Sequence, residues 1–271
     1  MKKILIKIYI FFRRHIVRGL GLSKITWIRN LNVRFEKFLK GKKESFVHKH
    51  GLKIWLDPRE SLAEKFGAKE PESTQLLFKN LQEGGVFIDI GASIGWFTLI
   101  AAKLVGETGK VVAIEPEPNS FALLTKNIKE NGFENVVSSK QAAASDSQEK
   151  KTLYVVGDAW TWSSMEDPRK DYEHKIGSNF GKDDDKTIRE YRVDAVRIDD
   201  ISPQRADFIK IDVEGVVDPV FRGAMETIRR NPDIKLLIED PTPFITQKLE
   251  KMGYVHKIVD LNNTFFWKGK D

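Results

Sequence analysis

From Val86 to the C-terminus, short and strongly apolar segments alternate with segments whose apolar residues recur at helical spacing. Parallel strands are joined only through a crossover, usually a helix, so this alternation predicts a parallel sheet covered by helices. The expected fold class is α/β, with a doubly wound sheet that is parallel for most of its strands. The expected strands are Val86–Ile90, Lys110–Ile114, one within Asn135–Ala144, Lys151–Val156, Val193–Ile198, Asp207–Val213 and Ile234–Ile238, closed by an antiparallel hairpin of Tyr254–Val259 with Thr264–Trp267.

Helices are expected between these strands, where glycine, asparagine and proline mark several of their ends. They are a segment from Glu72 to Gly84-Gly85, then Trp96–Leu104, Ser120–Glu130, Asp218–Arg230 and Phe244–Met252. A strand pair is expected at Phe46–Lys49 and Leu52–Leu56. We divide the chain into an accessory region with an N-terminal helical appendage, residues 1–60, and a ligand-binding domain, residues 61–271, with an irregular insert at 157–190.

The composition excludes several classes of protein. With 41% hydrophobic residues, 17 Phe and 6 Trp, the chain has enough apolar surface to form a core and is not a disordered protein. It has no cysteine, which excludes disulfides and thiolate chemistry and is consistent with a reducing, cytoplasmic location. Its net charge of +6 permits an anionic partner without requiring one. No apolar stretch reaches the roughly 18 residues of a membrane-spanning helix.

Residues 1–22 have the pattern of a basic amphipathic helix. On a helical projection Lys3, Lys7, Arg14 and Arg18 share a narrow arc, and apolar and aromatic residues fill much of the remainder. Two interpretations stay open. The helix docks peripherally on an anionic membrane surface, or it packs against its own domain or a second copy in a homodimer, with the basic stripe solvated.

The segment Asp89-Ile90-Gly91-Ala92-Ser93-Ile94-Gly95 joins an expected strand to an expected helix. Gly91 and Gly95 remove side chains where a ligand must approach the backbone closely. The spacing is neither the GxGxxG of dinucleotide sites nor the GxxxxGK[ST] of triphosphate loops. It suits a cofactor that carries an amino-acid head in place of a pyrophosphate; the alternative is a tight structural turn.

Glu115 follows the next strand, 24 positions after Gly91. An acid at the end of the second strand can accept hydrogen bonds from both hydroxyls of a ribose. A solvated acid at a strand end is the alternative, and the spacing from the glycine loop favours the ribose interpretation.

Asp212 and Glu214 follow the strand that contains Phe208–Ile211. Alternation places both side chains on one side of the extended chain, at the edge of the sheet where α/β proteins bind ligands. Such a pair can hold a divalent cation, Mg²⁺ or Mn²⁺, or one member can accept a proton. The alternative is an acidic residue that stabilises a helix N-terminus.

Taken together, the segments VFIDIGASIGWFTLIAAKL, VVAIEPEPNSFALLTKNI, VRIDDI, DFIKIDVEG and FRGAMETI resemble the FkbM-type family of class I S-adenosylmethionine-dependent methyltransferases. The resemblance covers roughly residues 70–239 and implies a seven-stranded Rossmann-like sheet in the 61–271 domain. It also implies methyl transfer, typically to a sugar or polyketide-type hydroxyl. By the same resemblance Asp89, Gly91, Ala92 and Gly95 form the cofactor loop, Glu115 binds the ribose, residues Ala143 to Asp146 cover the adenine, and Asp212 and Glu239 are the acids of the next two strand ends. Where the family often has a second Glu after DVEG, this chain has Val217.

The expected activity is therefore O-methylation of a hydroxyl on a sugar or glycan, with S-adenosylmethionine as cofactor. The expected base is Asp212, followed by Glu214, Glu239 and His256, and a metal at Asp212 and Glu214 would acidify the hydroxyl. Other acceptors, a polyketide or another small molecule, stay open, as does a cofactor-binding protein without catalysis. No nucleic-acid partner is expected, since no NPPY-like or DPPY-like segment follows the fourth strand. Trp160 and Trp162 either stack on a sugar or pack in the core.

Overall fold

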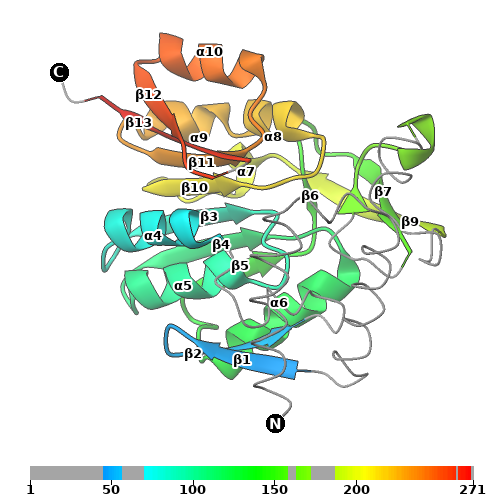
Figure 1. Ribbon diagram of the computed structural model, residues 1–271, viewed down its shortest axis with the longest axis horizontal. Coiled ribbons are helices and arrows are strands. Elements are labelled where there is room, and N and C mark those ends of the chain that lie inside the picture. Colours follow the sequence, from blue (N-terminus) through cyan, green and yellow to red (C-terminus); the bar gives the residue numbers. More distant parts are fainter. Residues whose placement is uncertain (1–44, 57–69, 158–162, 172–186, 261, 270–271) are drawn as a thin grey trace, which may run out of the picture.

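The computed structural model describes residues 45–56, 70–157, 163–171, 187–260 and 262–269 (Figure 1). The helix expected at 1–22 and a second one at about 25–39 lie outside the described residues, and so do Trp160 and Trp162. Membrane docking and pairing of two copies through residues 1–22 therefore stay predictions. Within the described ranges no helix has the length and apolarity to cross a bilayer.

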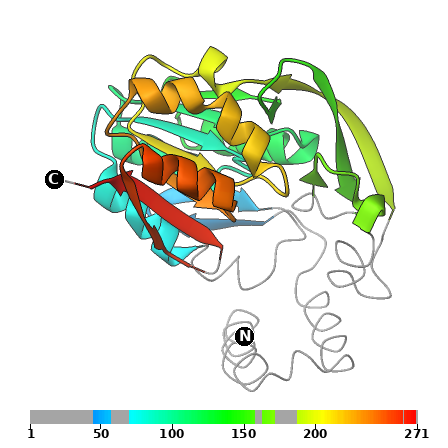
Figure 2. The ribbon, with the colours of Figure 1, turned by 90° about the horizontal axis from the view of Figure 1, so that it is seen from above.

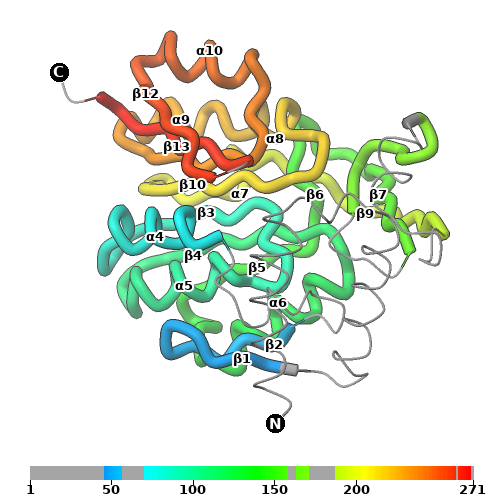
Figure 3. Tube along the Cα trace, viewed as in Figure 1, coloured from blue at the N-terminus to red at the C-terminus, as the bar shows by residue number. Residues whose placement is uncertain are grey.

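A seven-stranded sheet forms the centre of the fold, in the order β12-β13-β11-β10-β3-β4-β5 (Figures 1 and 3). Its strands are β3 (Val86–Ile90), β4 (Lys110–Ile114), β5 (Val137–Lys140), β10 (Phe208–Ile211), β11 (Lys235–Glu239), β12 (Tyr254–Ile258) and β13 (Asn263–Lys268). Strands β5, β4, β3, β10 and β11 run parallel, and β13 is antiparallel to both of its neighbours. The chain builds outward from β3 in one direction and from β10 in the other, so a topological switch point lies between these two strands. The doubly wound, mostly parallel sheet is confirmed.

Helices cover both faces of this sheet (Figure 2). Along β3, Phe87 packs into a core with helices α4 (Pro71–Asn80), α5 (Trp96–Val105) and α6 (Pro118–Glu130). Ile88 and Ile90 face the opposite way, into a second core. That core also contains residues of α7 (Ile198–Ile201), α8 (Val217–Gly223), α9 (Met225–Arg230) and α10 (Pro243–Lys251).

The single helix expected at 218–230 is wrong, because the chain forms two short helices that meet at Ala224. Gly223 ends the first of them and packs directly on another backbone segment. A Cβ atom at Gly223 would lie 2.0 Å from the carbonyl oxygen of Ser145. Glycine both permits this contact and weakens the helix at that point.

A smaller sheet flanks the main one, in the order β6-β9-β7-β8. Its strands are β6 (Ala143–Ala144), β7 (Lys150–Val156), β8 (Ser163–Ser164) and β9 (Ile188–Val196), and a 3-10 turn follows at Pro168–Asp171. Strand β9 begins earlier than the expected strand at 193–198, and Ile198 instead opens α7. Part of the expected irregular insert therefore forms strands, which place its residues beside the carboxyl edge of the main sheet.

Strands β1 (Ser45–Lys49) and β2 (Leu52–Leu56) form the expected antiparallel hairpin. Two asparagines connect this hairpin to α6. Asn127 of α6 forms hydrogen bonds with the backbone of Trp55, and Asn131, which caps α6, with the backbone of Lys53. These bonds satisfy edge groups that would otherwise face solvent.

Candidate functional site

A cavity of about 320 Å³ opens at the carboxyl edge of the main sheet, at the switch point between β3 and β10. It is built from the ends of β3, β4, β10 and β11, with β6, β7 and β8 along one side. Its lining residues are Ile90, Gly91, Ser93, Ile114, Glu115, Pro116, Ser120, Ala143, Ala144, Leu153, Ser163, Ser164, Met165, Asp212, Val213, Glu214, Val216 and Glu239. Open α/β sheets bind their ligands at this place.

The glycine loop after β3 forms one wall of the cavity. Gly91, Ser93 and Gly95 all have positive φ angles, of 78°, 51° and 93°, so the chain turns sharply between β3 and α5. A Cβ atom at Gly91 would lie 1.8 Å from the carbonyl oxygen of Asp212, and one at Gly95 would lie 2.7 Å from Leu124. The contact with backbone requires glycine at position 91, whereas at Gly95 the positive φ angle favours glycine and the neighbour is a side-chain methyl. Gly91 in addition lines the cavity.

Glu115 lies at the end of β4, with a side chain that is only 5% exposed. Its two carboxylate oxygens accept the backbone N–H groups of Ser93, at 2.8 Å, and Glu117, at 2.9 Å. These bonds fix the carboxylate beside the glycine loop. Burial outweighs them and raises the pKa of Glu115 to about 7. Each oxygen keeps lone pairs that can accept further hydrogen bonds.

Three acidic side chains line the cavity around the ends of β10 and β11. The hydrogen bond between Glu239 and Asp212 is the main cause that raises the pKa of Glu239 to about 9, and burial and the charge of Asp212 add to it. Glu239 therefore keeps its proton to a higher pH than an ordinary glutamate does, and a protonated Glu239 can donate to Asp212. At the rim, desolvation by neighbouring protein atoms and the charges of Asp212 and Asp240 raise the pKa of Glu214.

Lys210, two residues before Asp212 on β10, is the site residue that sequence reasoning missed. Its side chain is 1% exposed, and its ammonium lies 4.6 Å from the centre of the Phe97 ring. Burial alone would lower the pKa of Lys210, but the nearby Asp212, Glu70 and Asp89 raise it instead. A lysine within an apolar strand was the available signal, because a buried charge needs a partner.

Asp89 does not line the cavity. Asp89 is 1% exposed and its Oδ2 atom accepts the hydroxyl of Thr98 on α5, at 2.5 Å, while its Oδ1 atom has no hydrogen-bond partner among the described residues. Strand pairing sets Asp89 opposite Lys210, whose charge partly offsets the rise that burial causes in the pKa of Asp89. The structure therefore joins Asp89 to the buried Lys210 and not to the cavity.

The other predicted residues divide into two groups. Gly91, Glu115, Ala143, Asp212, Glu214 and Glu239 come together in the cavity. Ala92, Gly95 and Asp146 are not among its lining residues, and Asp146 forms an ion pair with Arg222 at 2.9 Å. His256 lies on β12, the outermost strand, 3.6 Å from Glu250.

The residues described here give no support to a metal site at Asp212 and Glu214. Within the described ranges no group of three or more His, Asp or Glu side chains is arranged to hold a metal ion. The Oδ2 atom of Asp212 is instead occupied by the ammonium of Lys210, at 2.5 Å.

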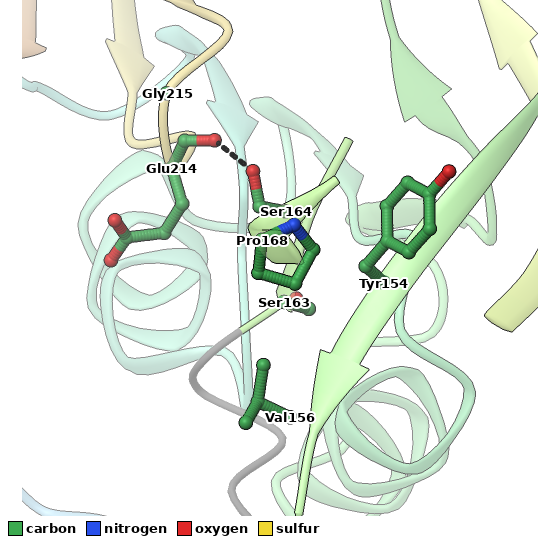
Figure 4. Close-up of a pocket in the computed structure, with 7 residues that line it drawn as sticks. All are labelled: Tyr154, Val156, Ser163, Ser164, Pro168, Glu214 and Gly215. Atoms are coloured by element: carbon green, nitrogen blue, oxygen red, sulfur yellow. Dashed lines mark hydrogen bonds between the residues drawn. The ribbon is translucent and has the colours of Figure 1, made fainter. Parts of the chain in front are cut away.

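A second cavity, of about 110 Å³, adjoins the first on the side of β7 and β8 (Figure 4). The two cavities share Ser163, Ser164 and Glu214. The remaining lining residues of the second are Tyr154, Val156, Pro168 and Gly215.

This sheet order, with a glycine loop after β3 and a buried acid after β4, is the arrangement of class I S-adenosylmethionine-dependent methyltransferases. A family model described as the methyltransferase FkbM domain matches residues 89–256, and the chain belongs to that family. The family resemblance of the sequence is thereby confirmed.

Two curated relatives match a short part of the chain. A probable cobalt-precorrin-6B C(15)-methyltransferase (decarboxylating) of Sulfurisphaera tokodaii is 44% identical over 57 residues, which are 21% of this chain and 30% of the relative. A protein-L-isoaspartate O-methyltransferase of Methanococcus maripaludis is 37% identical over 57 residues, 21% of this chain and 27% of the relative. The chain thus matches less than a third of the length of these two relatives. Among solved structures, a methyltransferase FkbM from Methylobacillus flagellatus is 16% identical and has a TM-score of 0.44, with 72% of this chain and 50% of that chain covered.

The residues present fit S-adenosylmethionine. Glu115 offers carboxylate lone pairs beside the glycine loop, and the small side chains of Ala143 and Ala144 line the same cavity. No described residue that lines the cavity is basic, whereas three are acidic beyond Glu115. That charge complements a ligand that carries a positive sulfonium.

Proposed function

We propose that this protein methylates a hydroxyl group of a neutral sugar or glycan. The observation that carries the proposal is the place of Asp212, a carboxylate on the cavity wall that contacts both the ammonium of Lys210 and the carboxyl group of Glu239. A fixed carboxylate at the reaction centre suits a hydroxyl acceptor, because a hydroxyl has to lose its proton when it is methylated.

The cofactor residues follow from the same cavity. Glu115 would accept hydrogen bonds from the ribose hydroxyls, and Gly91 with Ser93 would lie against the methionine part. Ala143 and Ala144 would contact the adenine. Asp89 would not contact the cofactor directly. It would support the loop from outside the cavity, since it accepts the hydroxyl of Thr98 and is paired across the strands with Lys210.

When bound, S-adenosylmethionine supplies an electrophilic methyl group, and the acceptor oxygen bonds to it as the carbon–sulfur bond breaks and sulfur keeps the electron pair. Asp212 would orient the acceptor hydroxyl by accepting its hydrogen bond. The proton of that hydroxyl becomes strongly acidic as the new bond forms, so a carboxylate whose charge is already stabilised by Lys210 still accepts it. Asp212 would then release the proton to solvent, because its side chain is 31% exposed.

The surroundings of Asp212, Glu239 and Glu214 suit the three acids to different roles in the reaction. Glu239, protonated and bonded to Asp212, would hold the Asp212 carboxylate in place and is the second candidate for the base. Glu214 is exposed at the boundary of the two cavities, which suits contact with the acceptor more than proton removal. We do not propose His256 as the base, since it lies on the outermost strand and lines neither cavity.

The test is transfer of isotope-labelled methyl from S-adenosylmethionine to a glycan extract, followed by hydrolysis. A methyl ether survives mild alkali, whereas a methyl ester of a carboxylate does not. Label retained on a monosaccharide after mild alkali supports the proposal. Label found only in alkali-labile, nitrogen-bound or carbon-bound form would assign the enzyme to a different acceptor.

A further inference from the structure

The second cavity is built onto the side of the cofactor cavity. Ser163, Ser164 and Glu214 line both of them, so a ligand in the smaller cavity reaches the larger one at these residues. Asp212, the expected base, lies two residues before Glu214. The smaller cavity therefore lies where an acceptor must be held while one of its hydroxyls faces Asp212.

The lining of the second cavity is divided into an apolar and a polar side. Tyr154, Val156 and Pro168 supply apolar surface, and Figure 4 shows Tyr154 and Glu214 on opposite sides with Pro168 and Ser164 between them. Hydroxyl and carboxylate groups gather where the two cavities meet. A pyranose ring has the same division, with a C–H face that packs on aromatic rings and a rim of hydroxyls that needs hydrogen-bond partners.

The aromatic wall is held rigidly. Tyr154 is paired with Ser164 on β8 and with Glu190 on β9. The guanidinium of Arg169 lies 5.5 Å from the centre of the Tyr154 ring and is itself fixed by Asp167 and Glu190, each at 2.7 Å. A surface fixed before the ligand arrives loses little freedom on binding.

The polar side is tied directly to the reaction centre. The hydroxyl of Ser164 donates to the carbonyl oxygen of Glu214 at 2.9 Å, which joins β8 to the loop that follows Asp212 (Figure 4). A Cβ atom at Gly215 would lie 3.6 Å from the hydroxyl oxygen of Ser164, so strand β8 and this loop approach within contact distance. A ligand bound against β8 would therefore lie at a defined position relative to Asp212.

The charge of the described lining selects against anionic acceptors. None of the described residues that line either cavity is a lysine, arginine or histidine, and Glu214, Asp212 and Glu239 are acidic. The charge of Arg169, next to Tyr154, is offset by its two carboxylate partners. A uronate or a sugar phosphate would meet the carboxylate of Glu214, and none of the described lining residues offers it a cation.

We infer that the second cavity binds one neutral pyranose ring of the acceptor, with its C–H face on Tyr154 and Pro168 and its hydroxyl rim toward Ser164 and Glu214. The inference rests on the methyl transfer proposed above and adds a subsite and a preference for neutral sugars. It makes Tyr154 and Val156 residues that determine specificity, while the cofactor is bound elsewhere, at Glu115.

The experiment is saturation-transfer NMR on the full chain in the presence of S-adenosylhomocysteine. The probes are the methyl α-glycosides of glucose, mannose, rhamnose and glucuronic acid at equal concentration. At least one neutral glycoside should show transfer through its ring C–H protons, and the glucuronide should show none. Tyr154→Ala should weaken the response about tenfold, as expected for the loss of one aromatic contact, and Val156→Phe should abolish it by filling the cavity.

Thr152→Ala is the matched control, because Thr152 lies on the same face of β7 but lines neither cavity. Calorimetry with S-adenosylmethionine separates the possible failures. Unchanged cofactor affinity in Tyr154→Ala and Val156→Phe shows that both variants are folded. If the cofactor binds but no neutral glycoside gives a signal that depends on Tyr154, or the glucuronide binds as well as the others, the inference is overturned while the proposed methyl transfer stands. Absent cofactor binding in the unaltered protein would instead refute the proposed function.

Discussion

The Nζ atom of Lys210 on β10 lies 2.5 Å from the Oδ2 atom of Asp212, the first residue after that strand. The lysine side chain is 1% exposed, whereas the aspartate is 31% exposed at the edge of the cavity. The buried ammonium of Lys210 therefore does not line the cavity itself, but it pairs with the Asp212 carboxylate, which does. Removing one partner of such a pair leaves a buried charge without compensation.

We therefore expect Lys210→Met to destabilise the fold by about 3–5 kcal/mol at pH 8, because Asp89 and Asp212 lose their cation. The charge of Lys210 lowers the pKa of the buried Asp89 carboxyl, so without Lys210 that pKa rises further, and the loss should grow as pH rises and shrink toward pH 5. Urea unfolding at both pH values measures this difference. Lys110→Met, which changes an exposed strand lysine, should cost little. A loss for Lys210→Met that is equally large at pH 5 and pH 8 would show that packing, not charge, is what Lys210 contributes.

The second prediction concerns metal dependence. Lys210 already supplies positive charge to Asp212, and the described residues offer no third ligand beside Asp212 and Glu214. Incubation with a chelator should therefore leave methyl transfer to a glycan extract within about twofold of the untreated rate. Loss of activity that is restored by Mg²⁺ or Mn²⁺ would reinstate the metal that the sequence suggested.

The third prediction is a pH dependence of cofactor affinity. Burial raises the pKa of Glu115 to about 7, so the carboxylate that we propose as the acceptor of the ribose hydroxyls is lost as the pH falls through that value. Affinity for S-adenosylmethionine should decline below pH 7, by up to about tenfold per pH unit. Calorimetry between pH 5.5 and 8.5 follows this decline, and in Glu115→Gln the curve should be flat and weaker throughout. A Glu115→Gln variant with the pH profile of the unaltered protein would assign the titration to another group.

The stability contribution of Glu115 has the opposite sign. A carboxyl whose folded-state pKa is raised stabilises the fold most below its ordinary pKa, near 4.5, and this contribution is lost as the pH rises toward 7. Cofactor binding therefore improves over the same pH range in which the empty fold loses stability. The two measurements together distinguish a role in binding from a purely structural one.

The fourth prediction compares two glycines of similar backbone conformation. Gly91 and Gly132 have φ angles of 78° and 71°, but a Cβ atom at Gly91 would strike the carbonyl of Asp212, whereas one at Gly132 would meet nothing within 4 Å. Gly132→Ala should cost about 1–2 kcal/mol from backbone strain alone. Gly91→Ala should cost more than about 4 kcal/mol or prevent folding. Equal melting temperatures for the two variants would contradict the close approach of β3 and β10 at this point.

The sequence was sufficient to place the first two strands of the main sheet and the acidic residues at its carboxyl edge. Apolar segments bounded by glycine and acidic residues located β3 and β4 to the residue. Since parallel strands end at one edge of the sheet, Glu115 and Asp212 were expected there, and the family resemblance added Glu239; all three line the cavity.

The surroundings of Asp89, Lys210 and Asp146 could not be predicted, because they depend on the direction of side chains and on contacts between residues distant in sequence. Asp89 precedes the last residue of β3, so its side chain turns to the α5 face, away from the cavity edge. Its partner Lys210 is adjacent only through the pairing of β10 with β3, which no local pattern encodes. Asp146 likewise had a partner, Arg222, that only the folded chain brings near.

The most direct test of the account is the rate of labelled methyl transfer to a glycan extract by the Asp212→Asn variant. Asparagine keeps the shape of the side chain and removes the charge that accepts the hydroxyl proton. Turnover should fall about 10²–10⁴-fold, while the melting temperature and most of the affinity for S-adenosylmethionine are retained. Asp194→Asn, at an exposed residue of β9, is the control and should keep full activity. Full turnover by Asp212→Asn, with the cofactor bound normally, would contradict the account and remove Asp212 from the reaction.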